Sequence, residues 1–254
     1  MKLMITKDYQ EMSLLAAEAV ESVVRRKKNA LLGLTTGNTP IGMYHALAEK
    51  SRAGELNMRE THIFSMEEYL GIPPDNYQSL YQWLNRVLIE PCGIASERVN
   101  RIDGSAPEPQ LACQVFDRTI ESMGGLDLVV EGIGTNGHIG FNEPMSPPDS
   151  PTRIVALSSE TQTYNFAYWD ELVPAHGITV GLAAIMKAKE IVLIASGSKK
   201  AYALKQALEG PVTSEIPASY LQLAPQLTII ADREAASLLT IDKEGGFPCP
   251  HSSV

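Results

Sequence analysis

His138 and Glu143 lie five residues apart, in a loop where residues 132–140 include four glycines. An imidazole that titrates near neutrality can take up and release protons, and a nearby carboxylate can orient it. Glycines permit positive φ angles and the close approach of a ligand to the main chain. The side-chain amide of Asn142 adds a further hydrogen-bonding group. These residue types at this spacing predict an acid–base active site.

A buried strand should deliver this loop, because residues 126–130 are almost entirely apolar and rich in β-branched side chains. In open α/β sheets, ligands bind outside the carboxyl ends of the strands. A lone histidine in a glycine-rich loop is also commonly a surface turn residue, and His138 by itself fits that interpretation equally well. The neighbouring carboxylate and amides favour a functional loop.

A second candidate loop is formed by residues 36–40, Thr-Gly-Asn-Thr-Pro. It follows a predicted strand at residues 30–35 and precedes a predicted helix at residues 41–50, with Pro40 at the first helical position. Free N–H groups at the helix start and the hydroxyls of Thr36 and Thr39 can face one anion. The loop is neither a Walker motif nor the dinucleotide GxGxxG pattern. A plain helix with Thr39 as its N-cap is the competing interpretation.

Two more predicted strands end in charged side chains. Residues 62–66 lead directly into Glu67 and Glu68, and adjacent carboxylates point in different directions, so at most one should face a pocket. A solvated acidic turn is the alternative. Residues 190–195 form a buried strand followed by Lys199 and Lys200, either of which is placed to bind an anion, although a lysine there is more often exposed.

The order of the elements indicates the fold. Helical spacing after Asp8 and over residues 107–123, a helix face after Lys200, and strands at residues 153–157 and 227–231 complete an alternation of strands and helices. We therefore predict an α/β fold, a doubly wound, mainly parallel sheet with helices on both faces, similar to a Rossmann fold. Residues 177–181 should introduce a short helix that ends near residue 188. We expect one domain over residues 1–240 and a disordered tail over residues 241–254.

Composition restricts the function classes. The chain has 254 residues and a net charge of −9, which argues against nucleic acid or an anionic membrane surface as a partner. The three cysteines, Cys92, Cys113 and Cys249, have no metal-ligand spacing, so a reduced cytoplasmic protein is the simplest interpretation. No stretch has the length of a signal peptide or a membrane span.

Four motifs, in this order, resemble the glucosamine-6-phosphate deaminase / galactosamine-6-phosphate isomerase family. They are residues 36–40, residues 66–69 (Met-Glu-Glu-Tyr), residues 132–144 (Gly-Ile-Gly-Thr-Asn-Gly-His-Ile-Gly-Phe-Asn-Glu-Pro) and residues 196–201 (Ser-Gly-Ser-Lys-Lys-Ala). The resemblance runs from about Met1 to about Asp232. The related 6-phosphogluconolactonases share the fold but lack the Phe-Asn-Glu-Pro continuation, so they rank second.

The resemblance implies the substrate and the roles of the site residues. A hexosamine 6-phosphate would be isomerised and deaminated to a ketose 6-phosphate and ammonia, without a metal or an organic cofactor. His138, oriented by Glu143, would open the sugar ring, and Glu67 would move a proton between C2 and C1. Phosphate would be bound by Lys200 and by the turn whose residues are Thr36, Gly37, Asn38 and Thr39.

Three positions depart from the deaminase pattern. Glu67 stands where the deaminases usually have Asp, Asn136 replaces another Asp beside His138, and residues 161–169 contain no arginine for the phosphate. Asparagine at the Asn136 position also occurs in the galactosamine-6-phosphate isomerase branch, so these changes favour a different substrate. A lactonase-type hydrolase and a weakly catalytic sugar-phosphate binding or sensing protein stay as alternatives. Oligomeric state is left open, with a homo-oligomer among the possibilities.

Overall fold

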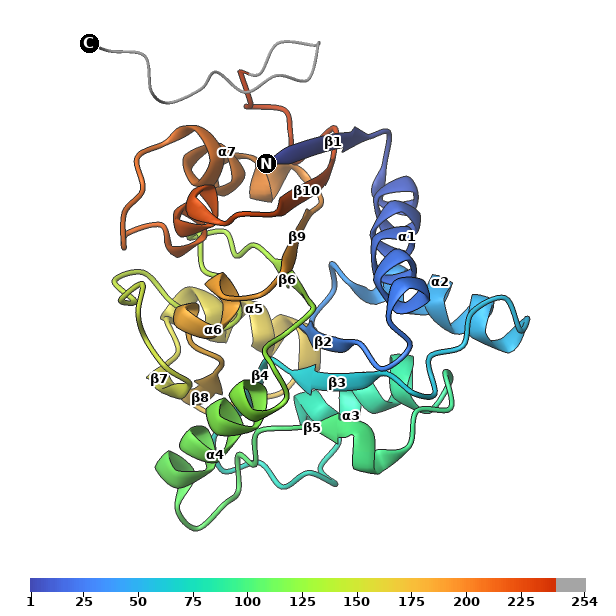
Figure 1. Ribbon diagram of the computed structural model, residues 1–254. Coiled ribbons are helices and arrows are strands. Elements are labelled where there is room, and N and C mark those ends of the chain that lie inside the picture. The colour runs from blue at the N-terminus through green and yellow to red at the C-terminus, as the bar shows by residue number, and fades with distance from the viewer. Residues whose placement is uncertain (241–254) are drawn as a thin grey trace.

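The computed structural model describes residues 1–240, and the tail predicted to be disordered, residues 241–254, lies outside the described residues. A seven-stranded, fully parallel sheet with the strand order β1-β10-β9-β6-β2-β3-β5 forms the centre of the molecule (Figure 1). Its strands are β1 (Lys2–Thr6), β2 (Leu31–Leu34), β3 (His62–Ser65), β5 (Val99–Asn100), β6 (Leu128–Gly132), β9 (Glu190–Ala195) and β10 (Leu227–Asp232). The predicted doubly wound α/β fold is therefore confirmed.

Helices cover both faces of this sheet (Figure 1). They are α1 (Tyr9–Arg26), α2 (Ile41–Arg52), α3 (Leu80–Leu84), α4 (Pro109–Ser122), α5 (Ser159–Trp169), α6 (Leu182–Met186) and α7 (Ala201–Glu209). Short 3₁₀ segments at Ser96–Arg98, Ser198–Lys200 and Pro217–Leu223 and a π-helical segment at Asn85–Ile89 complete the described elements.

Alternate side chains of the central strands enter two separate hydrophobic cores. On β6, Val129 packs with α4, α6 and α7, whereas Leu128 and Val130 pack with α1, α2 and α3. This alternation follows from the two-residue period of a strand, and it requires apolar residues at every position because both faces are covered. The apolar runs in the sequence are the consequence.

Helix α1 shows how local sequence sets an element's limits. Asp8 caps it by accepting a hydrogen bond from the N–H of Glu11 at 3.0 Å, and Arg25 and Arg26 lie in its last turn. A carboxylate at the amino end and cations at the carboxyl end both complement the helix dipole. Arg25 and Arg26 thus close an amphipathic helix.

The order in which strands are added to the sheet reverses between β2 and β6. From β2 the chain proceeds outwards through β3 and β5, and then β6 pairs with the other side of β2. Loops that leave adjacent strands at such a switch point diverge to opposite faces and open a crevice at the carboxyl ends. The loop after β2 is the predicted anion turn, and the loop after β6 contains His138.

A second, three-stranded antiparallel sheet was not predicted. It has the order β4-β8-β7, with β4 at Glu67–Tyr69, β7 at Arg153–Ala156 and β8 at His176–Thr179. The expectation that residues 177–181 introduce a short helix is confirmed, because Gly181 is the N-cap of α6, but the strand formed by residues 176–179 was not predicted. The pairing of β4 with β8 joins segments more than a hundred residues apart, which local patterns do not reveal.

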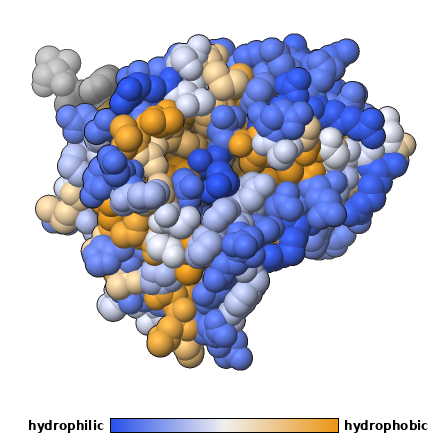
Figure 2. All heavy atoms as spheres, turned by 90° about the horizontal axis from the view of Figure 1, so that it is seen from below, coloured by the Kyte–Doolittle hydropathy of each residue, from blue (hydrophilic) through white to orange (hydrophobic). Residues whose placement is uncertain are grey.

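Helix α5 was also missing from the sequence-based prediction. Ser158 caps it by accepting from the N–H of Thr161 at 3.1 Å, but only Thr161 among its residues is buried, so the helix carries no clear apolar stripe. Of the helices described, none is long and apolar enough to cross a membrane. Figure 2 shows a face on which hydrophilic residues predominate and hydrophobic ones gather in separate patches.

Candidate active site

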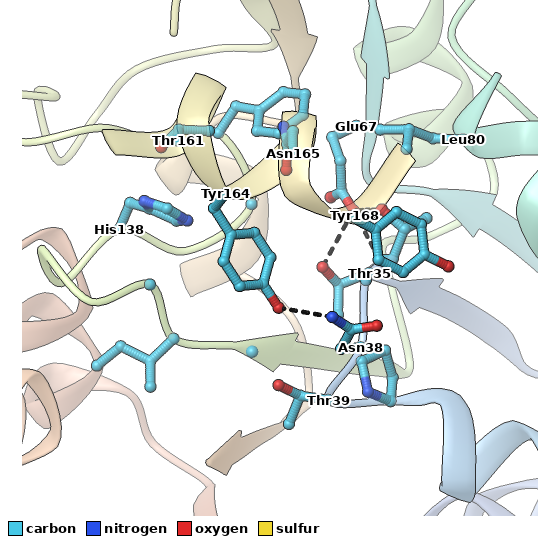
Figure 3. Close-up of a pocket in the computed structure, with 18 of the residues that line it drawn as sticks. Thr35, Asn38, Thr39, Glu67, Leu80, His138, Thr161, Tyr164, Asn165 and Tyr168 are labelled. Carbon is cyan, nitrogen blue, oxygen red and sulfur yellow. Dashed lines mark hydrogen bonds between the residues drawn. The ribbon is translucent and has the colours of Figure 1, made fainter. Parts of the chain in front are cut away.

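A pocket opens at the carboxyl ends of β2 and β6, between the loops that follow them and α5 (Figure 3). The predicted site residues that line it are Thr36, Gly37, Asn38, Thr39, Glu67, His138 and Lys200. Asn136 and Glu143 are bonded to each other next to His138 and do not line the pocket. The fold therefore brings all four motifs to one place, although they are spread over more than 160 residues of sequence.

The turn after β2 presents its backbone to the pocket. Gly37 has a φ of 101°, a conformation that favours glycine. Pro40 is the N-cap of α2, one position earlier than predicted, and no side-chain hydrogen bond caps this helix, so the alternative in which Thr39 is the cap was wrong. Both Thr36 donors are directed to Glu67: its N–H lies 2.7 Å and its hydroxyl 2.8 Å from Glu67 Oε1.

Lys200 also lines the pocket and lies against an aromatic ring. Its Nζ is 5.5 Å from the centroid of Tyr164, whose hydroxyl accepts a 3.1 Å hydrogen bond from the side chain of Asn38 (Figure 3). Burial, together with the charge of Lys199, lowers the pKa of Lys200 to about 8, against the opposing charge of Glu160. Within residues 1–240 no carboxylate forms an ion pair with Lys200. Because desolvation disfavours the charged form of Lys200, a bound anion would stabilise that form.

His138 is held between the backbone of its own loop and a carboxylate. A Cβ on Gly134 would lie 2.3 Å from His138 Cε1, so only glycine allows the imidazole to rest there. The Nδ1 atom is 3.6 Å from Glu143 Oε2. Asn136 connects the two residues, because its Nδ2 donates to Glu143 Oε2 at 2.8 Å and its Oδ1 accepts from the N–H of His138 at 3.1 Å.

Glu143 is stabilised as a carboxylate. Its Oε1 accepts from the Thr161 hydroxyl at 2.6 Å and from the N–H of Ser158 at 3.1 Å, both at the start of α5. Partial burial opposes ionisation, but the interaction with His138 and the bonds from Thr161 and Asn136 outweigh it and hold the pKa of Glu143 at about 2. The carboxylate thus lies beside the imidazole and also fixes the first turn of α5.

Glu67 is the carboxylate that reaches the pocket, and it is only 2% exposed. Its Oε1 accepts three hydrogen bonds, from the two Thr36 donors and from the Thr35 hydroxyl, whereas Oε2 has no partner among the described residues. Burial raises the pKa of Glu67, the bonds from Thr36 and Thr35 act against this, and the charge of Glu68 adds to it. A carboxylate with a raised pKa and one free oxygen is suited to proton abstraction.

Glu68, unlike Glu67, is bonded to the start of a helix. Its carboxylate accepts from the Ser79 hydroxyl at 2.7 Å and from the N–H groups of Leu80 and Tyr81, at the start of α3. Glu68 is 3% exposed, so the alternative of a solvated acidic turn was wrong for both carboxylates. Strand geometry turns them to opposite sides, and Glu67 alone of the two lines the pocket.

Two pocket features went unnoticed in the sequence. Tyr164 occupies the part of α5 in which no arginine was found, and Glu131, fully buried at the end of β6, lies behind the site. A glutamate that continues an apolar strand directly before Gly132 is a signal that could have revealed the second feature. Within the described residues, no cluster of histidine, cysteine, aspartate and glutamate could hold a metal ion.

Comparison with known proteins identifies the family. The model of the family described as glucosamine-6-phosphate isomerases/6-phosphogluconolactonase matches residues 7–229. The chain belongs to this family. Among its members, the glucosamine-6-phosphate deaminase of Thermoanaerobacter pseudethanolicus is 43% identical over 241 residues, which cover 94% of this chain and 95% of that protein. The glucosamine-6-phosphate deaminase 2 of Bacillus subtilis is 39% identical, with 94% and 98% covered.

Solved structures of the family have the same architecture. A monomeric glucosamine-6-phosphate deaminase superposes with a TM-score of 0.91 at 34% identity, over 94% of this chain and 100% of its own. The 6-phosphogluconolactonase of Trypanosoma brucei superposes with a TM-score of 0.78 at 18% identity, over 94% of this chain and 98% of that one. At this identity the similarity shows that the two proteins share a fold, and nothing more. The expectation that the deaminases resemble this chain more than the lactonases do is confirmed.

Proposed function

We propose that this protein converts a hexosamine 6-phosphate, glucosamine 6-phosphate in the first place, to a ketose 6-phosphate and ammonia. One observation carries the proposal: a pocket at the switch point of the sheet has a buried carboxylate, Glu67, an imidazole paired with a carboxylate, His138 with Glu143, and a partly buried lysine, Lys200. The names of the relatives at about 40% identity agree with it.

Substrate binding begins with the phosphate. Lys200 supplies the charge, and the turn containing Gly37, Asn38 and Thr39 supplies polar groups at the start of α2. Tyr164, whose hydroxyl is already bonded to Asn38, gives a hydroxyl at the position where the family resemblance led us to expect an arginine. A phosphate bound there would leave the sugar ring directed towards His138 and Glu67.

Ring opening is the first chemical step. His138 takes the proton from the O1 hydroxyl of the pyranose and returns a proton to O5 as the C1–O5 bond breaks, so that the open-chain aldehyde forms. Glu143 keeps the imidazole in position and stabilises its protonated form, which exists between the two transfers. Asn136 holds the backbone of His138 and the carboxylate of Glu143 together.

Isomerisation and loss of ammonia follow. Glu67 Oε2, which is free of hydrogen-bond partners among residues 1–240, removes the C2 proton, and the same proton is delivered to C1. In the same isomerisation the aldehyde oxygen O1 takes up a proton and the amine nitrogen loses one, so the product carries an imine at C2 and a hydroxyl at C1. Water adds to C2, and the C–N bond breaks to release ammonia and leave the ketone.

A turnover assay tests this proposal. The protein is incubated separately with glucosamine 6-phosphate, galactosamine 6-phosphate and 6-phosphogluconolactone, and ammonia, ketose phosphate and released acid are measured. We expect ammonia and ketose phosphate in equal amounts from a hexosamine 6-phosphate. Acid release from the lactone alone would select the hydrolase alternative. Ligand-dependent thermal stabilisation without turnover of any substrate would select a binding or sensing protein.

The setting of the reaction also stays a proposal. Cys92 and Cys113 are free and buried, which agrees with a reduced cytoplasmic protein. The substrate is a small sugar phosphate, and the negative net charge gives no positive field for nucleic acid or anionic membranes.

A further inference from the structure

A second buried carboxyl group lies behind Glu67. Glu131 is the fourth residue of β6, has no exposed surface, and is directed to the same face of the sheet as Val129. Its Oε2 accepts one hydrogen bond, from the N–H of Gly140 at 3.1 Å, and its Oε1 has no partner among the described residues. A carboxylate in this position has far too few donors to be stable as an anion.

Glu131 and Glu67 share two neighbours. Gly140 donates to Glu131, and a Cβ on the same glycine would lie 3.6 Å from Glu67 Oε2, the second carboxyl oxygen without a partner. The Thr35 hydroxyl donates to Glu67 Oε1 at 3.1 Å, and the N–H of Thr35 donates at 3.3 Å to the carbonyl of Val130, the residue before Glu131, so Thr35 lies beside both groups. A hydroxyl can accept one proton while it donates another, and Thr35 can therefore connect the two acids.

Among the described residues, Glu67 and Glu131 lack an ion-pair partner. The guanidinium of Arg153 donates hydrogen bonds to the side chains of Asn142, Ser146 and Ser150 instead. The other titratable groups nearby are Glu68, bonded to α3, and Tyr44, which donates to the carbonyl of Thr35 at 2.6 Å. His138 and Lys200 face the pocket on its open side.

Electrostatics then decide the charge state of the pair. Burial raises the pKa of Glu131 well above its ordinary value, and the charge of Glu67 raises it further. Glu67 keeps three donors to its Oε1, whereas Glu131 has one backbone donor, so the negative charge is better stabilised on Glu67. Two acids this poorly hydrated do not both ionise at neutral pH.

We propose that Glu131 is a positioning residue for Glu67: the two carboxyl groups hold one proton between them, Glu131 keeps it, and Glu67 remains the only anion at the base of the pocket. Glu131 does not touch the substrate. By staying neutral it adds no second negative charge beside Glu67, and at alkaline pH it ionises, so that two like charges then lie together at the base of the pocket. This role rests on the proposed function only in so far as Glu67 is the base.

Infrared spectroscopy tests the shared proton without any substrate. The carbonyl stretch of a protonated carboxylic acid is recorded at pH 7 for the wild type and for Glu131→Gln, Glu67→Gln and Asp127→Asn. Asp127 is the matched control, because it is a buried carboxylate just before the same strand but is paired with Lys27 and Lys189 at 2.7 Å each. We expect the band to be lost in Glu131→Gln and kept in the other two. Loss of the band in Glu67→Gln instead, or its persistence in Glu131→Gln, would overturn the proposal.

Kinetics test the consequence for the reaction. Glutamine mimics the neutral form of Glu131, so at pH 7 the variant should keep kcat within about threefold, while the alkaline limb of its pH profile moves up by about one unit or more, the coupling at which two acids titrate as a pair. A superimposable pH profile for the two proteins would mean that Glu131 has a structural role alone. If neither protein turns over any hexosamine phosphate, the proposed function fails, and the infrared result still decides whether Glu131 keeps the proton.

Discussion

Replacing Glu143 by glutamine separates the two roles that the structure gives to this carboxylate. Glutamine has nearly the same shape, and its carbonyl oxygen can still accept from Thr161 and Ser158. The amide nitrogen then takes the place of Oε2 and faces the side-chain N–H₂ of Asn136, a donor, and His138 Nδ1. One buried donor is left without an acceptor, and the negative charge beside the imidazole is lost.

The size of the effect follows from the pKa of Glu143, which is about 2 in the folded protein against an ordinary value of 4.5. A change of one unit corresponds to about 1.4 kcal/mol, and the Glu143 side chain is only 12% exposed, so ionisation of Glu143 contributes on the order of 3 kcal/mol to the free energy of unfolding at neutral pH. Because the folded pKa is the lower one, this stabilisation is complete above pH 4.5 and disappears as the pH falls towards 2.

Urea unfolding of the wild type and Glu143→Gln between pH 3 and pH 7 measures this difference. We expect the wild type to be more stable at pH 7 and the gap to narrow steadily below pH 4.5. A double variant, Asn136→Asp with Glu143→Gln, serves as the matched control, because Asp at position 136 can accept from both the glutamine amide and the N–H of His138. It should recover part of the lost stability and of kcat.

A stability gap that does not change between pH 7 and pH 3 would refute this reasoning, since the loss would then come from packing and not from charge. The same conclusion would follow if the double variant were no better than Glu143→Gln alone. In that case Glu143 would hold α5 in place by shape, and the orientation of His138 would need another explanation.

Other perturbations of the pocket have equally specific outcomes. His138→Ala and Glu67→Gln should each lower kcat by about two to four orders of magnitude with little change in folding, and wild-type rates in Glu67→Gln would direct attention to another base. Loss of the Lys200 charge with rising pH should produce an inflection in kcat/KM near pH 8. Lys200→Arg stays charged, so this inflection should disappear in the variant. An inflection that is unchanged in Lys200→Arg would belong to another group. Gly134→Ala should displace the His138 imidazole and reduce kcat. Gly132→Ala, whose Cβ meets no atom within 4 Å, should keep the thermal stability of the wild type. Equal activity of Gly134→Ala and the wild type would contradict the close packing of Gly134 against His138.

Family membership and fold could be read from the sequence because both depend on local signals. Apolar runs marked β2, β6, β9 and β10, and turn residues at their ends marked the motifs. The anion turn and the His138 loop were expected at the same edge of the sheet, and the structure places both in one pocket. The catalytic roles assigned to these residues remain predictions for the assays above.

Other features depended on contacts between distant segments. Residues 62–66 were predicted as one strand with Glu67 and Glu68 at its end, but the chain bends at Met66, whose carbonyl accepts from the N–H of Val180 at 2.8 Å, and a new strand pairs with β8. Helix α5 has no strong apolar face, so its first turn is defined by Glu143, which lies sixteen residues before the helix begins. Neither contact leaves a periodic trace in the sequence.

The sequence by itself determined the doubly wound sheet, the identity of the loops at its switch point and the family, because strand periodicity and turn chemistry are properties of neighbouring residues. Only the tertiary structure decided which carboxylates act together. Glu67 and Glu131 are 64 positions apart on strands of different sheets, and their charge states depend on burial and on the donors around them. These quantities exist only once the chain is folded, since desolvation and charge coupling act through space.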